Sequence, residues 1–256
     1  MARRTKGRVV SEASLLEVRG LSKRFGGLQA VRDLAFGMAP GEVLGLIGPN
    51  GAGKTTAFNL ISGFLRPDTG DVRFRGQSLV GRPPHAICHL GLARTFQIVR
   101  PFPRFSVLDN VKVGALTRLP HVGEARERAH AVVERVGLGA KAQTPAGALT
   151  TADRKRLELA RALATEPTLL LLDEVMAGLT ATEMEAILQL VRSINTGGVA
   201  ILLIEHNMRA VMSLSHRIVV LSFGEKIAEG KPEAVANDPR VIEAYLGEEY
   251  VHAPGG

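Results

Sequence analysis

The residues best suited to chemistry form a glycine-rich loop of the pattern GxxxxGK[ST]. A short apolar run, Val43–Ile47, precedes the loop and a helical pattern over Thr56–Ser62 follows it, which is the strand–loop–helix context in which this pattern binds phosphate. Lys54 is then expected to reach the β- and γ-phosphates, and the Thr55 hydroxyl to ligate Mg²⁺. The pattern predicts binding of ATP or GTP. The loop reads Gly48-Pro49-Asn50-Gly51-Ala52-Gly53-Lys54-Thr55 and continues into Thr56.

Two adjacent carboxylates follow a second apolar run. Leu169–Leu172 has the pattern of a buried strand, and it ends in Asp173-Glu174. An aspartate at the end of such a strand, downstream of a phosphate loop, is expected to bind Mg²⁺. Glu174 is then placed to orient or deprotonate an attacking water. The alternative interpretation is a strand that runs into a solvated acidic turn, and the phosphate loop upstream favours the catalytic one.

A histidine follows the third apolar run. Ala200–Ile204 ends in Glu205-His206, and a lone histidine at a strand end is usually only a polar terminus. In a parallel sheet, however, the carboxyl ends of the strands meet at one edge, where ligands bind. Gly48, Asp173 and His206 are therefore expected to converge. His206 would then hydrogen-bond to the γ-phosphate or to the water.

The elements that must position these residues alternate between buried strands and helices. This alternation predicts a parallel α/β core. Leu15–Gly45, at the start of that core, has the pattern of β-strands. From Pro83 to Leu163 the pattern becomes helical and polar. The clearest helices are expected at Glu124–Val136, at about Asp153–Ala164, and after two overlapping capping boxes, Thr180…Glu183 and Thr182…Glu185.

The composition limits the classes of protein to which this chain can belong. The chain has 256 residues, a net charge of +7 and one cysteine. The length fits either one compact domain or a domain with an inserted subdomain, and the single cysteine fits a reducing compartment. No apolar run approaches the roughly 18 residues that cross a bilayer, and the basic start lacks the apolar stretch of a signal peptide. With no Trp and two Tyr, a stacking platform for single-stranded nucleic acid is disfavoured.

Arginines are concentrated in the stretch 66–104. Only Asp68 and Asp71 oppose them there. Such a stretch is either a solvated face or a contact surface for nucleic acid, acidic headgroups or an acidic protein. The arginines are at positions 66, 73, 75, 82, 94, 100 and 104.

The order of the motifs resembles that of the ATP-binding subunits of ABC transporters, from about Leu15 to Gly247. The resemblance implies that Gly48–Thr56 is the Walker A loop, that Leu169–Glu174 is Walker B with the catalytic glutamate, and that His206 is the switch histidine. It also implies that Phe25 stacks on adenine. Gln97 matches the Q-loop residue, which contacts Mg²⁺ and senses the membrane subunit.

Within that family, three segments look like the branched-chain amino acid importer ATPases. Relatives in this group also serve urea, amides and small aromatic acids, so the resemblance is more specific for the family than for the solute. The three segments are Arg94–Gln97, Asp173–Leu179 and Val241–Gly247.

The signature motif departs from the family pattern. Where the family usually has LSGGQ, this chain has Leu149-Thr150-Thr151-Ala152-Asp153. In the family this segment of one subunit caps the γ-phosphate of the ATP held by the other, so Thr150 and Ala152 are assigned to nucleotide binding. Asp153 suits a helix N-terminus as a cap, and the cations at 154–156 are expected to offset its charge. Either the motif works with altered contacts, which we favour, or only one of two ATP sites turns over well.

The sequence therefore predicts an α/β fold: a P-loop NTPase core of the RecA type, an N-terminal antiparallel β subdomain and an inserted helical subdomain at roughly 90–165. One ATPase domain is expected over 15–250, after a flexible basic extension at 1–14. The resemblance implies an ABC importer subunit that uses ATP and Mg²⁺ in a homo- or heterodimer. Its expected partners are two permease subunits and a periplasmic or extracellular solute-binding protein, and its expected location is peripheral, on the cytoplasmic face of a bacterial-type plasma membrane. The alternatives are a soluble ABC ATPase that acts on nucleic acid or ribosomes, and a regulatory subunit with little turnover.

Overall fold

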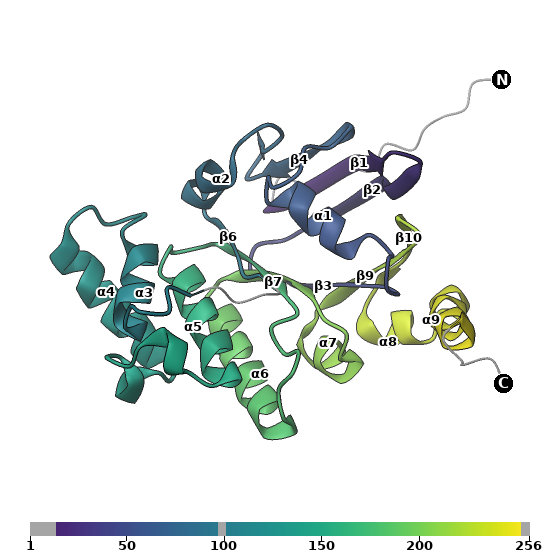
Figure 1. Ribbon diagram of the computed structural model, residues 1–256. Helices are drawn as coiled ribbons and strands as arrows, with labels where there is room; N and C mark the ends of the chain where they lie inside the picture. Colours follow the sequence, from purple (N-terminus) through teal and green to yellow (C-terminus); the bar gives the residue numbers. More distant parts are fainter. Residues whose placement is uncertain (1–13, 97–100, 252–256) are drawn as a thin grey trace, which may run out of the picture.

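The computed structural model describes residues 14–96 and 101–251, which form two β-sheets with helices around them (Figure 1). Helix α1 (Lys54–Ile61) lies between the two sheets, and α3 (Val107–Ala115), α4 (Val122–Arg135) and α5 (Thr151–Leu163) lie together at one end of the molecule. Within the described ranges, no helix combines the length and the apolarity needed to span a membrane. The predicted α/β class is confirmed.

The central sheet has the strand order β10-β9-β3-β8-β7-β6. All its strand pairs are parallel except that of β10 with β9. The three predicted apolar strands, β3, β7 and β8, are neighbours, and every residue of them is buried. The strands are β3 (Val43–Ile47), β6 (Leu92–Arg94), β7 (Leu169–Asp173), β8 (Ala200–Ile204), β9 (Arg217–Ser222) and β10 (Glu225–Gly230).

Both faces of this sheet are covered, which explains why its strands are apolar runs without alternation. Leu170 and Leu172 of β7 pack into a core with the helices on one face. Leu169 and Leu171 point to the opposite face and pack into a second core, with α1 and the antiparallel sheet.

The antiparallel sheet has the order β2-β1-β4-β5 and forms the predicted N-terminal β subdomain. Its long hairpin, formed by β1 and β2, turns at Gly26-Gly27. The strands are β1 (Leu16–Phe25), β2 (Leu28–Met38), β4 (Thr69–Phe74) and β5 (Gln77–Ser78).

The predicted helical insertion corresponds to helices that pack closely on one another. A Cβ added at Gly114 of α3 would lie 2.5 Å from the backbone oxygen of Arg161 in α5, so the absence of a side chain lets these two helices approach. One strand within the range 90–165 was not predicted: β6 pairs with β7 in the central sheet, and three residues are too few for a periodic signal. The helices are α2 (Pro84–Leu90), α3 (Val107–Ala115), α4 (Val122–Arg135) and α5 (Thr151–Leu163).

The remaining helices of the described residues, α6 to α9, follow β7 in the chain. Of the two predicted capping boxes, Thr180 with Glu183 is the one that forms, because α6 begins at Ala181 and Thr182 already lies inside the helix. The apolar face of α6 is buried at Ile187, Val191 and Ile194, among others. These helices are α6 (Ala181–Thr196), α7 (Met208–Leu214), α8 (Pro232–Ala236) and α9 (Pro239–Val251).

Candidate functional site

The phosphate loop runs from the end of β3 into α1, as predicted. Gly48 has φ +152° and Gly53 has φ +100°, and a Cβ at either would lie 2.3 Å or less from the backbone oxygen of Leu221 or Ala30, respectively. Only glycine fits these two positions. Lys54 is buried, and its Nζ donates to the carbonyls of Gly48 (2.6 Å) and Pro49 (2.8 Å). The ammonium group is thereby held inside the curl of the loop.

Asp173 ends β7 at the carboxyl edge of the sheet and is 2% exposed. Its Oδ2 accepts a hydrogen bond from Arg94 Nη2 at 2.7 Å. Its Oδ1 is buried and has no hydrogen-bond partner among the described residues. Since a buried carboxylate oxygen without a partner costs free energy, this atom is suited to a cation.

Arg94 was not predicted as a site residue, and its place in the arginine-rich stretch suggested a surface role. That expectation is wrong for Arg94, because its side chain is only 7% exposed. Besides Asp173, it donates to Asn59 Oδ1 (2.6 Å) and to Ser62 Oγ (3.0 Å), both near the end of α1. Its guanidinium lies within 5.7 Å of the ring centroids of three phenylalanines, Phe58, Phe64 and Phe96.

Glu174 and His206 are in direct contact. Their Oε1 and Nε2 atoms are 2.9 Å apart, although the residues are 32 positions apart in sequence. Glu174 adopts φ +50°, a left-handed conformation that is uncommon for a residue with a side chain. His206 is half exposed and Glu174 is mostly covered, with 50% and 15% of their side chains accessible. The predicted convergence is that of Gly48, Asp173 and His206, and the parallel strands β3, β7 and β8 end at or shortly before these three residues, at one edge of the sheet.

Two further carboxyls lie buried beside this edge. Burial raises the pKa of Glu205 to about 7, against the hydrogen bond that its Oε1 accepts from Met176 N. Burial likewise raises the pKa of Glu158, in α5, to about 7, and its Oε1 accepts from the backbone N–H of Phe96. Neither was predicted, because a glutamate inside an apolar pattern carries no sequence signal of its own burial.

The signature segment caps α5 in a way that differs from the prediction. Thr150, not Asp153, is the N-cap: its Oγ1 accepts from Asp153 N at 3.2 Å and donates to Asp153 Oδ2 at 3.0 Å. The charge of Asp153 is offset by Lys141, which forms an ion pair with it, and not by the cations at 154–156. Of those, Arg154 donates to the backbone oxygen of Gly147 and Lys155 to that of Glu174. Ala152 is half-buried in the first turn.

Two predicted residues remain, Phe25 in the antiparallel sheet and Gln97. Phe25 ends β1, is 46% exposed and has the ammonium group of Lys23 5.8 Å from its ring centroid. Gln97 lies outside the described residues. The backbone N–H of its neighbour Phe96 is the group that Glu158 holds.

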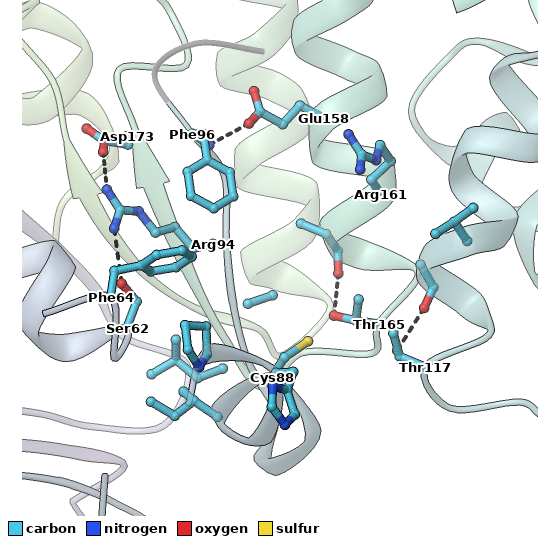
Figure 2. A pocket seen from close by; sticks show the side chains of 18 of the residues that line it. Ser62, Phe64, Cys88, Arg94, Phe96, Thr117, Glu158, Arg161, Thr165 and Asp173 are labelled. Carbon is cyan, nitrogen blue, oxygen red and sulfur yellow. Dashed lines mark hydrogen bonds and ion pairs between the residues drawn. The ribbon is translucent and has the colours of Figure 1, made fainter. Parts of the chain in front are cut away.

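A pocket of about 780 Å³ extends from the sheet edge toward the helical insertion (Figure 2). Thr55 and Asp173, the two described residues predicted to ligate Mg²⁺, both line it. In Figure 2, Arg94 and Asp173 lie on one side, Glu158 and Arg161 of α5 on the other, and the ring of Phe96 lies between them. The pocket therefore joins the predicted metal ligands to the helical insertion.

Comparisons with known families agree with this geometry. Residues 31–177 match the family described as ABC transporter. Residues 225–251 match the family described as branched-chain amino acid ATP-binding cassette transporter.

Individual proteins are similar over nearly the whole chain. The chain is 42% identical over 250 residues to the high-affinity branched-chain amino acid transport ATP-binding protein LivG of Escherichia coli, which covers 91% of this chain and 98% of that protein. It is 40% identical to BraF, the corresponding protein of Pseudomonas aeruginosa, with the same coverage. Among solved structures, the ADP conformation of MJ1267, an ATP-binding cassette of an ABC transporter, superposes with a TM-score of 0.83 at 30% identity and covers 91% of this chain and 99% of that one.

Proposed function

This chain belongs to the ABC transporter family as an ATP-binding subunit, and from that premise we propose that it drives the import of branched-chain amino acids or related small solutes. As a member of the family it is an ATPase that works with separate permease subunits. The observation that carries the catalytic part of the proposal is the 2.9 Å contact of Glu174 with His206 at the sheet edge that also holds Asp173. The 42% identity to a branched-chain amino acid transport protein supports the solute class.

The triphosphate of ATP binds at the loop between β3 and α1. Backbone N–H groups at the start of α1 point toward the phosphates, and the helix N-terminus favours their negative charge. Lys54 neutralises the β- and γ-phosphates by exchanging its present carbonyl partners for phosphate oxygens. Phe25, exposed at the end of β1, stacks on the adenine ring.

Mg²⁺ is held by the Thr55 hydroxyl and by Asp173, with Gln97 as a further ligand. The unpartnered Oδ1 of Asp173 supports this assignment, while Arg94 fixes the other oxygen of the same carboxylate. When bound, the ion neutralises phosphate oxygens and so favours the charge that develops in phosphoryl transfer.

Glu174 takes the proton of the water that attacks the γ-phosphorus. The new bond forms between the water oxygen and phosphorus, the bond to the oxygen that bridges to the β-phosphate breaks, and ADP leaves with that electron pair. His206 orients the carboxylate through its Nε2, and it would hydrogen-bond to the γ-phosphate or to the water once ATP is bound.

A second ATP-binding subunit completes each site, in a homo- or heterodimer. Thr150 and Ala152 at the start of α5 cap the γ-phosphate held by the other subunit. Because Lys141 neutralises Asp153, the altered signature places no unpaired carboxylate beside that phosphate, which supports a working motif with altered contacts.

The permease subunits contact the surface around the pocket between the core and the helical insertion. Exposed apolar rings cluster there, on both sides of the Q-loop position, and they suit a protein partner better than nucleic acid. A periplasmic or extracellular solute-binding protein delivers the solute, and the chain is peripheral on the cytoplasmic face of the membrane. The exposed rings are those of Phe64, Phe96, Phe102 and Phe105.

The test is uptake of radiolabelled leucine, isoleucine and valine by cells that lack this chain and are complemented with the wild type or with Glu174→Gln. We expect wild-type complementation to restore uptake and Glu174→Gln to leave it at the deletion level. ATP binding by the purified Glu174→Gln chain serves as the control for folding. Unchanged leucine uptake in the deletion strain, together with lost uptake of urea or an amide, would reject the solute class but not the transport function.

The two alternative functions make different predictions. A soluble ATPase that acts on nucleic acid or ribosomes would leave all solute uptake intact, and the identity to transport ATP-binding proteins does not favour it. A regulatory subunit with little turnover would be unaffected by Glu174→Gln, and the paired Glu174 and His206 argue against it.

A further inference from the structure

Lys155 is a buried lysine in the second turn of α5. It is 6% exposed, and burying an ammonium group is costly unless it has partners. Its Nζ donates a hydrogen bond to the backbone carbonyl of Glu174 at 2.9 Å. The bond joins the signature helix to the residue that is proposed to activate water.

The backbone of Glu174 is held at both its polar groups. Its N–H donates to the carbonyl of Ile204 at 3.0 Å, and its carbonyl accepts from Lys155. Between these two bonds the residue adopts φ +50°, an uncommon conformation for a residue with a Cβ, which persists only where the surroundings enforce it. The direction of the Cα–Cβ bond, and with it the contact with His206, therefore depends on both hydrogen bonds.

Nearby carboxyl groups compensate the positive charge of Lys155. It favours the ionised form of two buried carboxyls, Glu158 on the same helix and Glu205 beside His206. Lys155 thus lies near one acidic group of α5 and one that follows β8, and its ammonium group also reaches the backbone carbonyl after β7. An apolar side chain of similar size, such as methionine, would fill most of the space but could not donate to the Glu174 carbonyl.

We propose that Lys155 is a positioning residue for ATP hydrolysis, whose ammonium group holds the Glu174 carbonyl and thereby aims the Glu174 carboxylate at the attacking water. The inference rests on the proposed function, since it assigns Lys155 a part in the same reaction. Thr150 lies about 7.5 Å along the helix axis from Lys155, five residues at 1.5 Å each. A displacement of α5 by the partner's nucleotide is therefore passed directly to the chain's own Glu174.

The test compares Lys155→Met, which keeps the length but removes the donor, with Lys155→Gln, which keeps an N–H donor without the charge. Arg192→Gln removes an exposed positive charge from α6 and is the matched control. For each purified chain, kcat is measured from phosphate release and the ATP Kd from binding of a fluorescent ATP analogue. We expect Lys155→Met to lower kcat ten-fold or more, up to about 100-fold, because small misplacements of a catalytic group have effects of that size.

The expected pattern separates positioning from general stability. The ATP Kd of Lys155→Met should stay within two-fold of the wild type, Lys155→Gln should recover part of kcat, and Arg192→Gln should leave both unchanged. A folded Lys155→Met chain with kcat within two-fold of the wild type, or with its loss confined to ATP affinity, would overturn the inference. If Lys155→Met does not fold, Lys155→Gln is judged against Arg192→Gln by the same kcat criterion.

Wild type and Glu174→Gln in the same assay separate this inference from the proposed function. Wild-type hydrolysis that Glu174→Gln abolishes supports the function, whatever Lys155 does. A wild-type chain with no turnover, alone or with its membrane partners, would reject both.

Discussion

The substitution Glu205→Gln tests how burial changes the ionisation of a carboxyl at the edge of the central sheet. The carboxyl is 4% exposed, and burial raises its pKa from 4.5 to about 7 in the folded chain. Between these two values the folded state keeps a proton that the unfolded state releases. The stability that the protonated Glu205 carboxyl contributes is therefore fully present below about pH 4.5 and is lost as the pH rises through 7. The difference between the two pKa values corresponds to a loss of about 3 kcal/mol.

Glutamine does not titrate between pH 4.5 and 8, but it keeps the hydrogen bond that Glu205 accepts. Its amide oxygen can still accept from Met176 N, as Glu205 Oε1 does at 2.9 Å. The difference in unfolding free energy between Glu205→Gln and the wild type should therefore be small at pH 4.5 and grow to about 3 kcal/mol in favour of the variant at pH 8. All other titrating groups are common to both chains and cancel in the difference.

Urea unfolding followed by circular dichroism at pH 4.5, 6, 7 and 8 measures this difference. Glu124→Gln, on the exposed face of α4, is the control for exchanging a carboxyl for an amide. A difference that stays constant across the pH range would refute the assigned burial effect. A difference that grows in favour of the wild type would show that attraction to Lys155 exceeds the cost of burying the charge.

Three further predictions concern nucleotide and metal binding. Lys54→Ala should weaken ATP binding on the order of a thousand-fold in calorimetric titrations, because it removes the cation that faces the phosphates, and unchanged affinity would contradict the loop assignment. Arg94→Lys should raise the Mg²⁺ concentration needed for half-maximal ATPase activity, because lysine cannot hold Asp173 while also bonding to α1, and an unaltered Mg²⁺ dependence would separate Arg94 from the metal site. Lys141→Ala should raise the KM for ATP more at low salt than at high salt, because it leaves Asp153 unpaired near the partner's phosphate, and a salt-independent KM would show that this charge does not reach the nucleotide.

Much of the site could be predicted because its signals are local or follow from topology. The phosphate loop is a continuous pattern, and its glycines are required by backbone approach at Gly48 and Gly53. Asp173, Glu174 and His206 were predicted from their places after buried strands. Parallel strands bring their carboxyl ends to one edge, so strand order in the sequence was enough to expect the convergence.

Other features were mispredicted where the deciding contact is distant in sequence. Arg94 was expected to be one of seven surface arginines. Its side chain is instead buried with that of Asp173, which lies 79 residues away in the sequence. The compensation of the Asp153 charge was assigned to the cations that follow it, whereas Lys141, at the end of the 3-10 turn Gly139–Lys141, forms the ion pair with it. Strand β6 was missed because its three residues pair with residues of β7 that lie 77 positions further along the chain.

The sequence by itself determined the class of fold, and it predicted the nucleotide loop and the places of Asp173, Glu174 and His206, because hydrophobic period, glycine spacing and strand order are properties of the linear chain. Only the tertiary structure decided which charged groups face one another: Arg94 with Asp173, Lys141 with Asp153, and Lys155 with the Glu174 carbonyl. The physical reason is that a side chain's partner depends on helix rotation and packing across elements. A periodic pattern records which face is buried, but not which buried charge lies opposite.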